Sequence, residues 1–318
     1  MVERVLLASP RGYCAGVERA VETVERALDL HGPPVYVRKQ IVHNAHVVRE
    51  LEGRGAVFVE SEENVPHGAT LVLSAHGVAP TVHENAAGRG LATIDATCPL
   101  VTKVHVEARR YAQEGYTIVL IGHAGHEEVV GTTGEAPDAI VLVQTVDDAE
   151  QLDLPADTKL AYITQTTLSV DETNGIIAVL RRRFPHIHAP KKEDICYATS
   201  NRQWAVKEML GEIDLLLVIG SRNSSNSNRL VEAARGAGVA AYLIDDESEI
   251  EETWLEEVRT VGVTSGASAP EKLVTRVCDW FTSRGVLRIE PFRSVQEDIV
   301  FKLPLELRRR QRLSVENR

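Results

Sequence analysis

Short apolar runs alternate with longer amphipathic stretches along most of the chain. The apolar runs are rich in Val, Ile and Leu, which is typical of buried strands, and the longer stretches repeat apolar residues at helical spacing. The pattern predicts strands at Arg4–Ala8, Val35–Val37, Ala56–Val59, Thr70–Ser74, Thr117–Ile121, Ile140–Leu142, Lys159–Ile163, Leu215–Ile219, Ala241–Ile244 and Thr260–Val263. It predicts helices at Gly16–Asp29, Leu100–Gln113, Val170–Phe184, Asn201–Leu210, Asn228–Gly236 and Pro270–Arg284. Strands linked by helices indicate an α/β fold with parallel sheets.

A weak internal repeat is centred on three cysteines. Each of them follows a short extended piece and precedes a helical pattern, and a second polar motif comes at a nearly constant distance beyond it. A third motif, rich in Ser, Thr and small residues, follows later. The first two motifs pair Cys14 with His43 (29 residues apart), Cys98 with His126 (28 apart) and Cys196 with Ser224 (28 apart). The third motif contains His76, Thr166 and Ser268, which lie 62, 68 and 72 residues after the respective cysteines.

We interpret this repeat as three copies of one α/β unit around a pseudo-threefold axis. Ligands bind beyond the carboxyl ends of strands in open α/β sheets, so three such ends facing one axis would bring the cysteines together. The alternative is chance spacing in an ordinary α/β protein. The interpretation predicts three similar domains in a trefoil, at residues 1–97, 98–195 and 196–285, and a C-terminal tail at 286–318.

Charge and composition narrow the class of partner. The formal net charge is −11 and the sequence pI is about 5.5, which argues against nucleic acid or an anionic membrane as the main partner. The first ten residues lack the basic and apolar regions of a signal peptide, and no apolar run reaches the roughly 18 residues of a membrane span. We therefore expect a cytoplasmic protein.

The cysteines are too sparse for a disulfide scaffold, because there are only 4 in 318 residues. Three thiolates from distant loops suit a soft metal site, whereas zinc sites usually take four ligands and often use closely spaced pairs. In a cubane 4Fe–4S cluster, three thiolates leave one iron without a protein ligand, and such an iron is a Lewis acid for a substrate oxygen. The alternative is that the cysteines are small core residues. We adopt that reading for Cys278, which sits in a helical pattern beside Val274 and Val277.

The second and third motifs are rich in neutral groups that hold oxyanions. Imidazole, hydroxyl and amide donors lie near expected helix starts, where backbone N–H groups also point outward. This favours a phosphate site without an arginine clamp, although a serine at such a position is also an ordinary helix cap. The candidate residues are His43, His76, His126, Ser224, Ser225, Asn226 and Ser268.

Glu128 is the carboxyl group best placed to donate protons, and Thr166 is placed to pass a proton to or from a substrate hydroxyl. Such an acid must hold its proton at working pH, which burial provides. The alternative for Glu128 is an exposed turn residue.

These motifs together resemble the LytB-type family of 4-hydroxy-3-methylbut-2-enyl diphosphate reductases. The resemblance runs nearly end to end, and many long motifs in the same order make it far more specific than a single glycine pattern. The matching segments are PRGYCAGV (10–17), VHN (42–44), SAHGV (74–78), DATCPLVTKVH (95–105), GHAGH (122–126), TQTTLS (164–169), DICYAT (194–199), GSRNSSNSNR (220–229) and GASAP (266–270).

The resemblance implies a trefoil of three α/β domains around a 4Fe–4S cluster and the reductive removal of an allylic hydroxyl group. The products would be isopentenyl and dimethylallyl diphosphates, at the end of the non-mevalonate isoprenoid pathway. Thr166 would contact the substrate hydroxyl, and Glu128 would be the proton donor. The cluster ligands would be Cys14, Cys98 and Cys196, and the diphosphate ligands would be His43, His76, His126, Ser224, Ser225, Asn226 and Ser268.

One position departs from the family pattern. The family usually has proline between the histidine and the glutamate, whereas this chain has Glu127 there. Two other functions are compatible with the cysteines, namely a cluster-dependent hydratase and an iron–sulfur redox sensor. Because no nicotinamide or flavin fingerprint opens a strand–helix unit, we expect a partner such as ferredoxin or flavodoxin to supply electrons.

Overall fold

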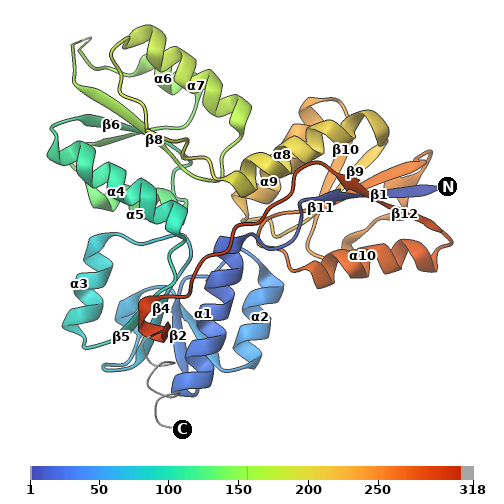
Figure 1. Ribbon diagram of the computed structural model, residues 1–318, viewed down its shortest axis with the longest axis horizontal. Coiled ribbons are helices and arrows are strands. Elements are labelled where there is room, and N and C mark those ends of the chain that lie inside the picture. Colours follow the sequence, from blue (N-terminus) through green and yellow to red (C-terminus); the bar gives the residue numbers. More distant parts are fainter. Residues whose placement is uncertain (1, 156, 309–318) are drawn as a thin grey trace. The chain divides into compact units, whose positions relative to one another are not determined.

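The computed structural model describes residues 2–155 and 157–308 (Figure 1). These residues divide into two compact units. Unit 1 comprises residues 2–17, 43–47 and 197–300, and unit 2 comprises residues 18–42, 48–196 and 301–308, within the described chain. The predicted tail falls partly on residues 309–318, which lie outside the described residues.

Unit 1 contains one five-stranded sheet in which all neighbouring strands are parallel. Its strand order is β10 (Ala240–Ile244), β9 (Leu215–Ile219), β11 (Thr260–Ser265), β1 (Arg4–Ser9) and β12 (Arg288–Arg293). The helices α8 (Tyr197–Met209) and α9 (Ser225–Gly236) cover one face, and α10 (Glu271–Ser283) covers the other (Figure 1).

The alternating side chains of β9 explain why helices cover both faces of this sheet. Leu215, Leu217 and Ile219 join a buried cluster with α10, while Leu216 and Val218 join a second cluster with α8 and α9. Successive residues of a strand point to opposite faces, so a strand that is apolar at every position must be buried on both sides.

Unit 2 contains two smaller parallel sheets. The four-stranded sheet has the order β3 (Ala56–Val59), β2 (Val35–Arg38), β4 (Thr70–Leu73), β5 (Ala92–Asp95). The three-stranded sheet has the order β7 (Ile140–Val143), β6 (Thr117–Ile121), β8 (Leu160–Thr164). The helices of unit 2 are α1 (Ala15–His31), α2 (Ala45–Gly53), α3 (Pro80–Gly88), α4 (Pro99–Gln113), α5 (Glu127–Glu135), α6 (Val146–Gln151) and α7 (Val170–Arg183), of which α1 and α2 begin in segments of unit 1.

Short 3₁₀ turns occur in both units. Within the described residues, one lies in unit 2, at Glu62–Asn64, and three lie in unit 1, at Leu210–Glu212, Glu247–Glu249 and Glu252–Leu255.

The predicted fold class of three parallel-sheet α/β units is confirmed, and every predicted strand and helix is present. The pattern missed β5, β12 and the shorter helices, among them α2, α3 and α5. Both missed strands lie at the edge of their sheets and carry charged or proline residues, which are typical of edge strands. The N-terminal strand β1 lies between β11 and β12 rather than with β2–β5. The domain boundaries themselves stay a prediction.

Candidate functional site

Each of the three repeat cysteines stands immediately before a helix. Cys14 precedes α1, Cys98 is the N-cap of α4, and Cys196 precedes α8. The thiol of Cys98 does not cap its helix. A helix N-terminus favours a nearby negative charge, so each cysteine stands where an anionic metal centre would be stabilised.

The cysteines also share one backbone contact with the third motif. The amide of Cys14 donates to the carbonyl of Ala267 (3.1 Å), that of Cys98 to Ala75 (2.9 Å), and that of Cys196 to Thr166 (3.0 Å). Each acceptor lies in or beside the motif that contains His76, Thr166 or Ser268. The repeat inferred from spacing is therefore also a repeat of hydrogen bonds.

The donor chemistry of these residues fits an iron–sulfur cluster. All four cysteines are described, none forms a disulfide, and Cys14, Cys98 and Cys196 are all partly exposed. Among the described residues, no three His, Cys, Asp or Glu side chains gather closely enough to hold one metal ion. A cluster takes one thiolate per iron, so its cysteines need not converge on a single point. Cys278, as predicted, packs against the core of unit 1.

In unit 2, His76 and His126 form an edge-to-face pair. Their ring centroids lie 5.9 Å apart at an interplanar angle of 88°. His126 is the N-cap of α5, and its Nδ1 accepts a hydrogen bond from the amide of Glu128 (3.1 Å). Because Nδ1 is an acceptor, the neutral ring carries its proton on Nε2, which is then available as a donor to an anion.

Glu128 is buried and accepts two hydrogen bonds from Thr166. Its side chain accepts from the amide of Thr166 (Oε1, 2.6 Å) and from the hydroxyl of Thr166 (Oε2, 3.0 Å). The alternative that Glu128 is an exposed turn residue is wrong, since the residue is only 2% exposed. Burial raises the pKa of Glu128 to about 7, even though the hydrogen bonds from Thr166 act to lower it. A carboxyl group with this pKa holds a proton for part of the time at neutral pH.

The neighbouring Glu127 has a different environment. It is the first residue of α5, and its carboxylate lies 3.7 Å from the ammonium group of Lys39. A carboxylate that lies in the first turn of a helix and is paired with a lysine is typical of a surface residue. The two adjacent glutamates therefore have separate surroundings.

In unit 1, the polar residues of the second motif form the start of α9. The hydroxyl of Ser224 caps the helix by accepting from the amide (3.3 Å) and the hydroxyl (2.9 Å) of Ser227. A side chain at Gly220 or Gly266 would place its Cβ within about 2 Å of the Ser227 hydroxyl, at 2.2 Å and 2.0 Å respectively. These glycines let the start of α9 approach the ends of β9 and β11. Ser225 is the first residue of the helix.

Asn226 and Ser268 link this helix start to neighbouring segments. The Asn226 side-chain oxygen accepts from the amide of Ala267 (2.9 Å), and its NH₂ group donates to Thr199 Oγ1 (3.3 Å). The hydroxyl of Ser268 donates to the carbonyl of His43 (2.9 Å). The segments of α9, Ser268 and His43 are thus held together in one unit.

His43 is a neutral ring at pH 7, because burial lowers its pKa to about 4. It directly precedes Asn44, whose side chain accepts from the amides of His46 and Val47 at the start of α2. The NH₂ group of Asn223 lies 3.3 Å from His43 Nδ1. An amide nitrogen only donates, so His43 also carries its proton on Nε2.

Sequence reasoning missed several residues of these networks. Asn223 and Thr199 lie within the matched motifs but have no period or spacing that distinguishes them from loop residues. Gln165 accepts from the amide of His123 (3.0 Å) and donates to Thr167 (2.9 Å), which fixes the loop after β8. The one signal that could have indicated Gln165 is its position between Thr164 and Thr166 in a matched motif.

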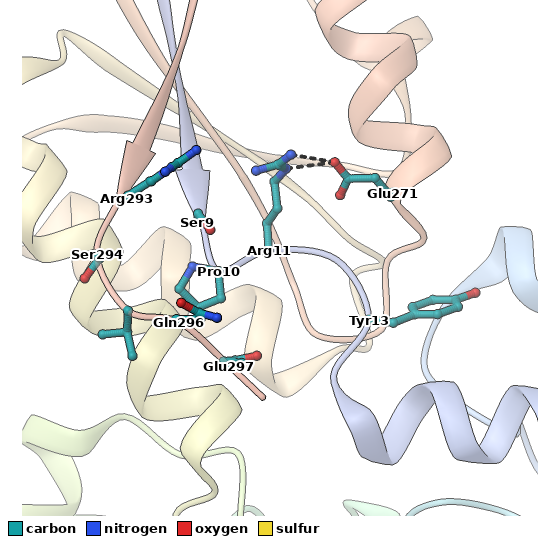
Figure 2. A pocket seen from close by; sticks show the side chains of 10 residues that line it. Ser9, Pro10, Arg11, Tyr13, Glu271, Arg293, Ser294, Gln296 and Glu297 are labelled. Carbon is teal, nitrogen blue, oxygen red and sulfur yellow. Dashed lines mark hydrogen bonds and ion pairs between the residues drawn. The ribbon is translucent and has the colours of Figure 1, made fainter. Parts of the chain in front are cut away.

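A cavity of about 630 Å³ lies in unit 1 beside the loop that leads to Cys14 (Figure 2). None of the predicted site residues lines it. Arg11 at its wall is paired with Glu271 at the start of α10 (2.7 Å). The cavity is therefore separate from the polar networks described above.

None of the helices within residues 2–155 and 157–308 has the length and apolar character needed to cross a membrane.

Comparison with known proteins gives consistent matches. Residues 5–282 match the sequence profile of the family described as LytB protein. A protein of Acidothermus cellulolyticus named 4-hydroxy-3-methylbut-2-enyl diphosphate reductase is 63% identical over 96% of this chain and 90% of its own length. One of Mycobacterium bovis, named 4-hydroxy-3-methylbut-2-enyl diphosphate reductase 1, is 61% identical over 96% of this chain and 92% of its own length.

Solved structures agree with these matches. The structure of the E-1-hydroxy-2-methyl-but-2-enyl-4-diphosphate reductase from Plasmodium falciparum superposes with a TM-score of 0.96 and 40% identity, covering 99% of this chain and all of that one. A second structure, described as the terminal enzyme of the non-mevalonate pathway, gives a TM-score of 0.63 and 30% identity over 89% of this chain and all of its own.

Proposed function

The chain belongs to the LytB protein family, and from this premise we propose that it reduces (E)-4-hydroxy-3-methylbut-2-enyl diphosphate to isopentenyl and dimethylallyl diphosphates. This reaction is the final step of the non-mevalonate isoprenoid pathway. The substrate loses its allylic hydroxyl group as water, and two electrons and two protons enter.

The observation that carries the proposal is the contact between Glu128 and Thr166. A buried acid with a pKa near 7 is bonded to a hydroxyl-bearing residue, and the carbonyl of that residue accepts the amide of Cys196. The residues proposed as proton donor, hydroxyl contact and thiol ligand are thus joined by one series of hydrogen bonds. General acids work best when their pKa lies near the operating pH.

Cys14, Cys98 and Cys196 would hold a 4Fe–4S cluster with one iron that has no protein ligand. When bound, this cluster supplies electrons and a Lewis-acidic iron for the substrate hydroxyl. Thr166 orients that hydroxyl through its own Oγ1. Glu128 transfers its proton, by way of Thr166 or directly, to the departing oxygen so that water leaves instead of hydroxide.

The diphosphate group is bound by neutral donors. Two histidines with a proton on Nε2, His43 and His126, offer N–H groups, and the start of α9 offers hydroxyl groups and the positive end of the helix. Fixed neutral donors bind the anion through hydrogen bonds alone. The proposed diphosphate ligands are His43, His76, His126, Ser224, Ser225, Asn226 and Ser268.

The reaction needs an outside source of electrons. We assign this role to an electron-donor protein such as ferredoxin or flavodoxin, and we assign the reaction to the cytoplasm, where thiols stay reduced.

The test is anaerobic purification, analysis of iron and sulfide, and turnover of the substrate with and without reduced methyl viologen. We expect stoichiometric iron and sulfide and product formation only with reductant. Product release without reductant would identify a hydratase. Cluster content with no turnover at all would favour a sensor.

A further inference from the structure

Three of the cations in this chain occupy matching positions after the three cysteines. Arg19 on α1 lies five residues beyond Cys14, Lys103 on α4 lies five beyond Cys98, and Arg202 on α8 lies six beyond Cys196. None of them is among the site residues predicted from the sequence.

Arg19 holds the segment that enters Cys98. Its Nη1 donates to the carbonyls of Ala96 (2.9 Å) and Thr97 (3.0 Å), and its Nη2 lies 3.4 Å from the carbonyl of Asp95. These are the three residues directly before Cys98. A guanidinium group has donors in a fixed fork, so it fixes the path of this segment more firmly than a single bond would.

Lys103 does the same for the segment that enters Cys196. Its ammonium group donates to the carbonyls of Lys192 (2.7 Å) and Glu193 (3.1 Å) and to the carboxylate of Asp194 (2.7 Å). The other oxygen of Asp194 accepts from the amide of Thr164 at the end of β8 (3.0 Å). The ammonium group thereby uses its donors on the residues just before Cys196.

Arg202 holds the loop that enters Cys14. Its side chain is fully buried, its Nη2 donates to the carbonyl of Gly12 (2.8 Å), and its Nη1 donates to the carbonyl of Ala198 (3.0 Å) and to Glu297 (3.1 Å). A hydroxyl from the same helix, that of Tyr197, accepts from the amide of Ala15 (3.3 Å). Contacts from α8 thus lie on both sides of Cys14.

The three contacts form a cycle in the sequence. The helix after Cys14 holds the approach to Cys98, the helix after Cys98 holds the approach to Cys196, and the helix after Cys196 holds the approach to Cys14. Arginine and lysine also hold backbone carbonyls elsewhere in the chain, so a single bond of this kind carries no argument. The same contact at all three repeat positions does.

We propose that Arg19, Lys103 and Arg202 are positioning residues for the three cysteine thiolates and that their positive charges favour the bound, reduced cluster. A cluster held by three thiolates is anionic, and nearby charge sets its reduction potential. The inference rests on the proposed function, because it requires that the three cysteines bind one cluster.

The test replaces each cation by methionine, which keeps the length of the side chain and removes its donors and charge. Each variant has a matched control, a cation of the same type that bonds to a backbone carbonyl more than ten residues in sequence from any of the three cysteines. Arg183, which bonds to Ala149 and Leu152, is the control for Arg19. Lys159, which bonds to Glu114, is the control for Lys103, and Arg235, which bonds to Ala241, is the control for Arg202. Iron loss to a chelator and the midpoint potential of the cluster are measured anaerobically on each reconstituted holoprotein.

We expect Arg19→Met, Lys103→Met and Arg202→Met each to lose iron at least about tenfold faster than wild type, since each substitution removes several hydrogen bonds that a charged group donates. Their midpoint potentials should become more negative, while the three control variants keep the wild-type rate and potential. If Arg202→Met does not fold, Arg202→Lys takes its place, because one ammonium group cannot reproduce the fork, and iron loss should still be faster.

Two results would overturn the inference in distinguishable ways. If wild-type protein holds a cluster and turns over substrate, but the cation variants match their controls in iron loss and potential, only the positioning role fails. If wild-type protein binds no cluster under the same conditions, the proposed function fails and the inference fails with it.

Discussion

The helix starts of unit 1 and unit 2 differ in the charge of the polar groups that they carry. At the start of α9 in unit 1, Ser224 and Asn226 are neutral and are bonded to neighbouring backbone and hydroxyl groups. In unit 2, the start of α5 instead carries Glu128, a buried carboxyl group whose pKa is raised to about 7. The same element, a helix that begins after a parallel strand, therefore carries a neutral amide near its start in one place and a titratable carboxyl group in the other.

The difference comes from one position of the helix. The residue after the first helical position is Asn226 in α9 and Glu128 in α5. The side-chain oxygen and NH₂ group of Asn226 both form hydrogen bonds, and the side chain is uncharged. Among the described residues, the carboxylate of Glu128 instead accepts two hydrogen bonds, both from Thr166, which offset part of the cost of its burial. One side chain at this position therefore distinguishes a neutral helix start from one that carries a titratable carboxyl group.

The largest effect on activity is expected for the three repeat cysteines, because the proposed cluster needs all of them in the same way. Cys14→Ser in unit 1 should abolish cluster content and activity as completely as Cys98→Ser or Cys196→Ser in unit 2, because each removes one of three thiolates. Cys278→Ser should leave both nearly intact, since Cys278 packs against the core. Anaerobic iron and sulfide analysis decides, and full cluster content in any of the first three variants would contradict the assignment.

Glu128→Gln should separate reaction from binding. It keeps the shape of the side chain and removes the acid, so kcat should fall by about 10²–10⁴ while the affinity for substrate stays close to wild type. Glu127→Gln is the matched control and should remain active, because Glu127 is paired with Lys39, whereas Thr166 bonds to Glu128. Single-turnover reduction of both variants is the measurement. Loss of turnover in Glu127→Gln alone would reverse the two roles.

Substitutions among the neutral donors should give the opposite result. His43→Ala and Ser225→Ala should weaken the binding of substrate and of inorganic diphosphate about ten- to hundredfold, with the cluster in place, since a lost donor to a charged group costs about 1.5–3 kcal/mol. Ser283→Ala, which removes an exposed hydroxyl that bonds the carbonyl of Trp280, is the control. Titration calorimetry measures the affinities, and unchanged values in both variants would refute the pocket.

The smallest predicted effect is a shift in pH dependence. The protonated form of Glu128 is the active one, so kcat should fall as the pH rises through about 7. The hydroxyl of Thr166 stabilises the carboxylate, so Thr166→Val should move this fall to higher pH. Glu128→Gln should lack it. A pH profile of kcat that is the same in all three proteins would show that the proton comes from another group.

Much of this arrangement could be predicted from the sequence, and the limits have physical causes. Apolar runs predicted every central strand, because strands buried on two faces must be apolar throughout. They did not predict β5 and β12, whose edge positions permit polar residues. The helices α8 and α9 begin earlier than predicted, since the first turn of each is polar and shows no period.

The site residues show a similar limit. Spacing related the three cysteines, and the family motif favoured Glu128 over Glu127 as the acid, but neither predicted the hydrogen bonds between Glu128 and Thr166. That contact depends on the chain folding back through β8 across a sequence separation of 38 residues. The cations Arg19, Lys103 and Arg202 were missed because a charged residue in a helix normally indicates a solvated face, whereas their donors are directed at backbone carbonyls distant in the sequence.

The central claim is that this chain consumes electrons to remove a hydroxyl group, and the most direct test is the electron count. Anaerobic protein is mixed with substrate and reduced methyl viologen, a one-electron donor, and viologen oxidation is compared with the isopentenyl and dimethylallyl diphosphates formed. The account predicts two viologens oxidised for each diphosphate product. Product formed without oxidation of viologen would contradict it.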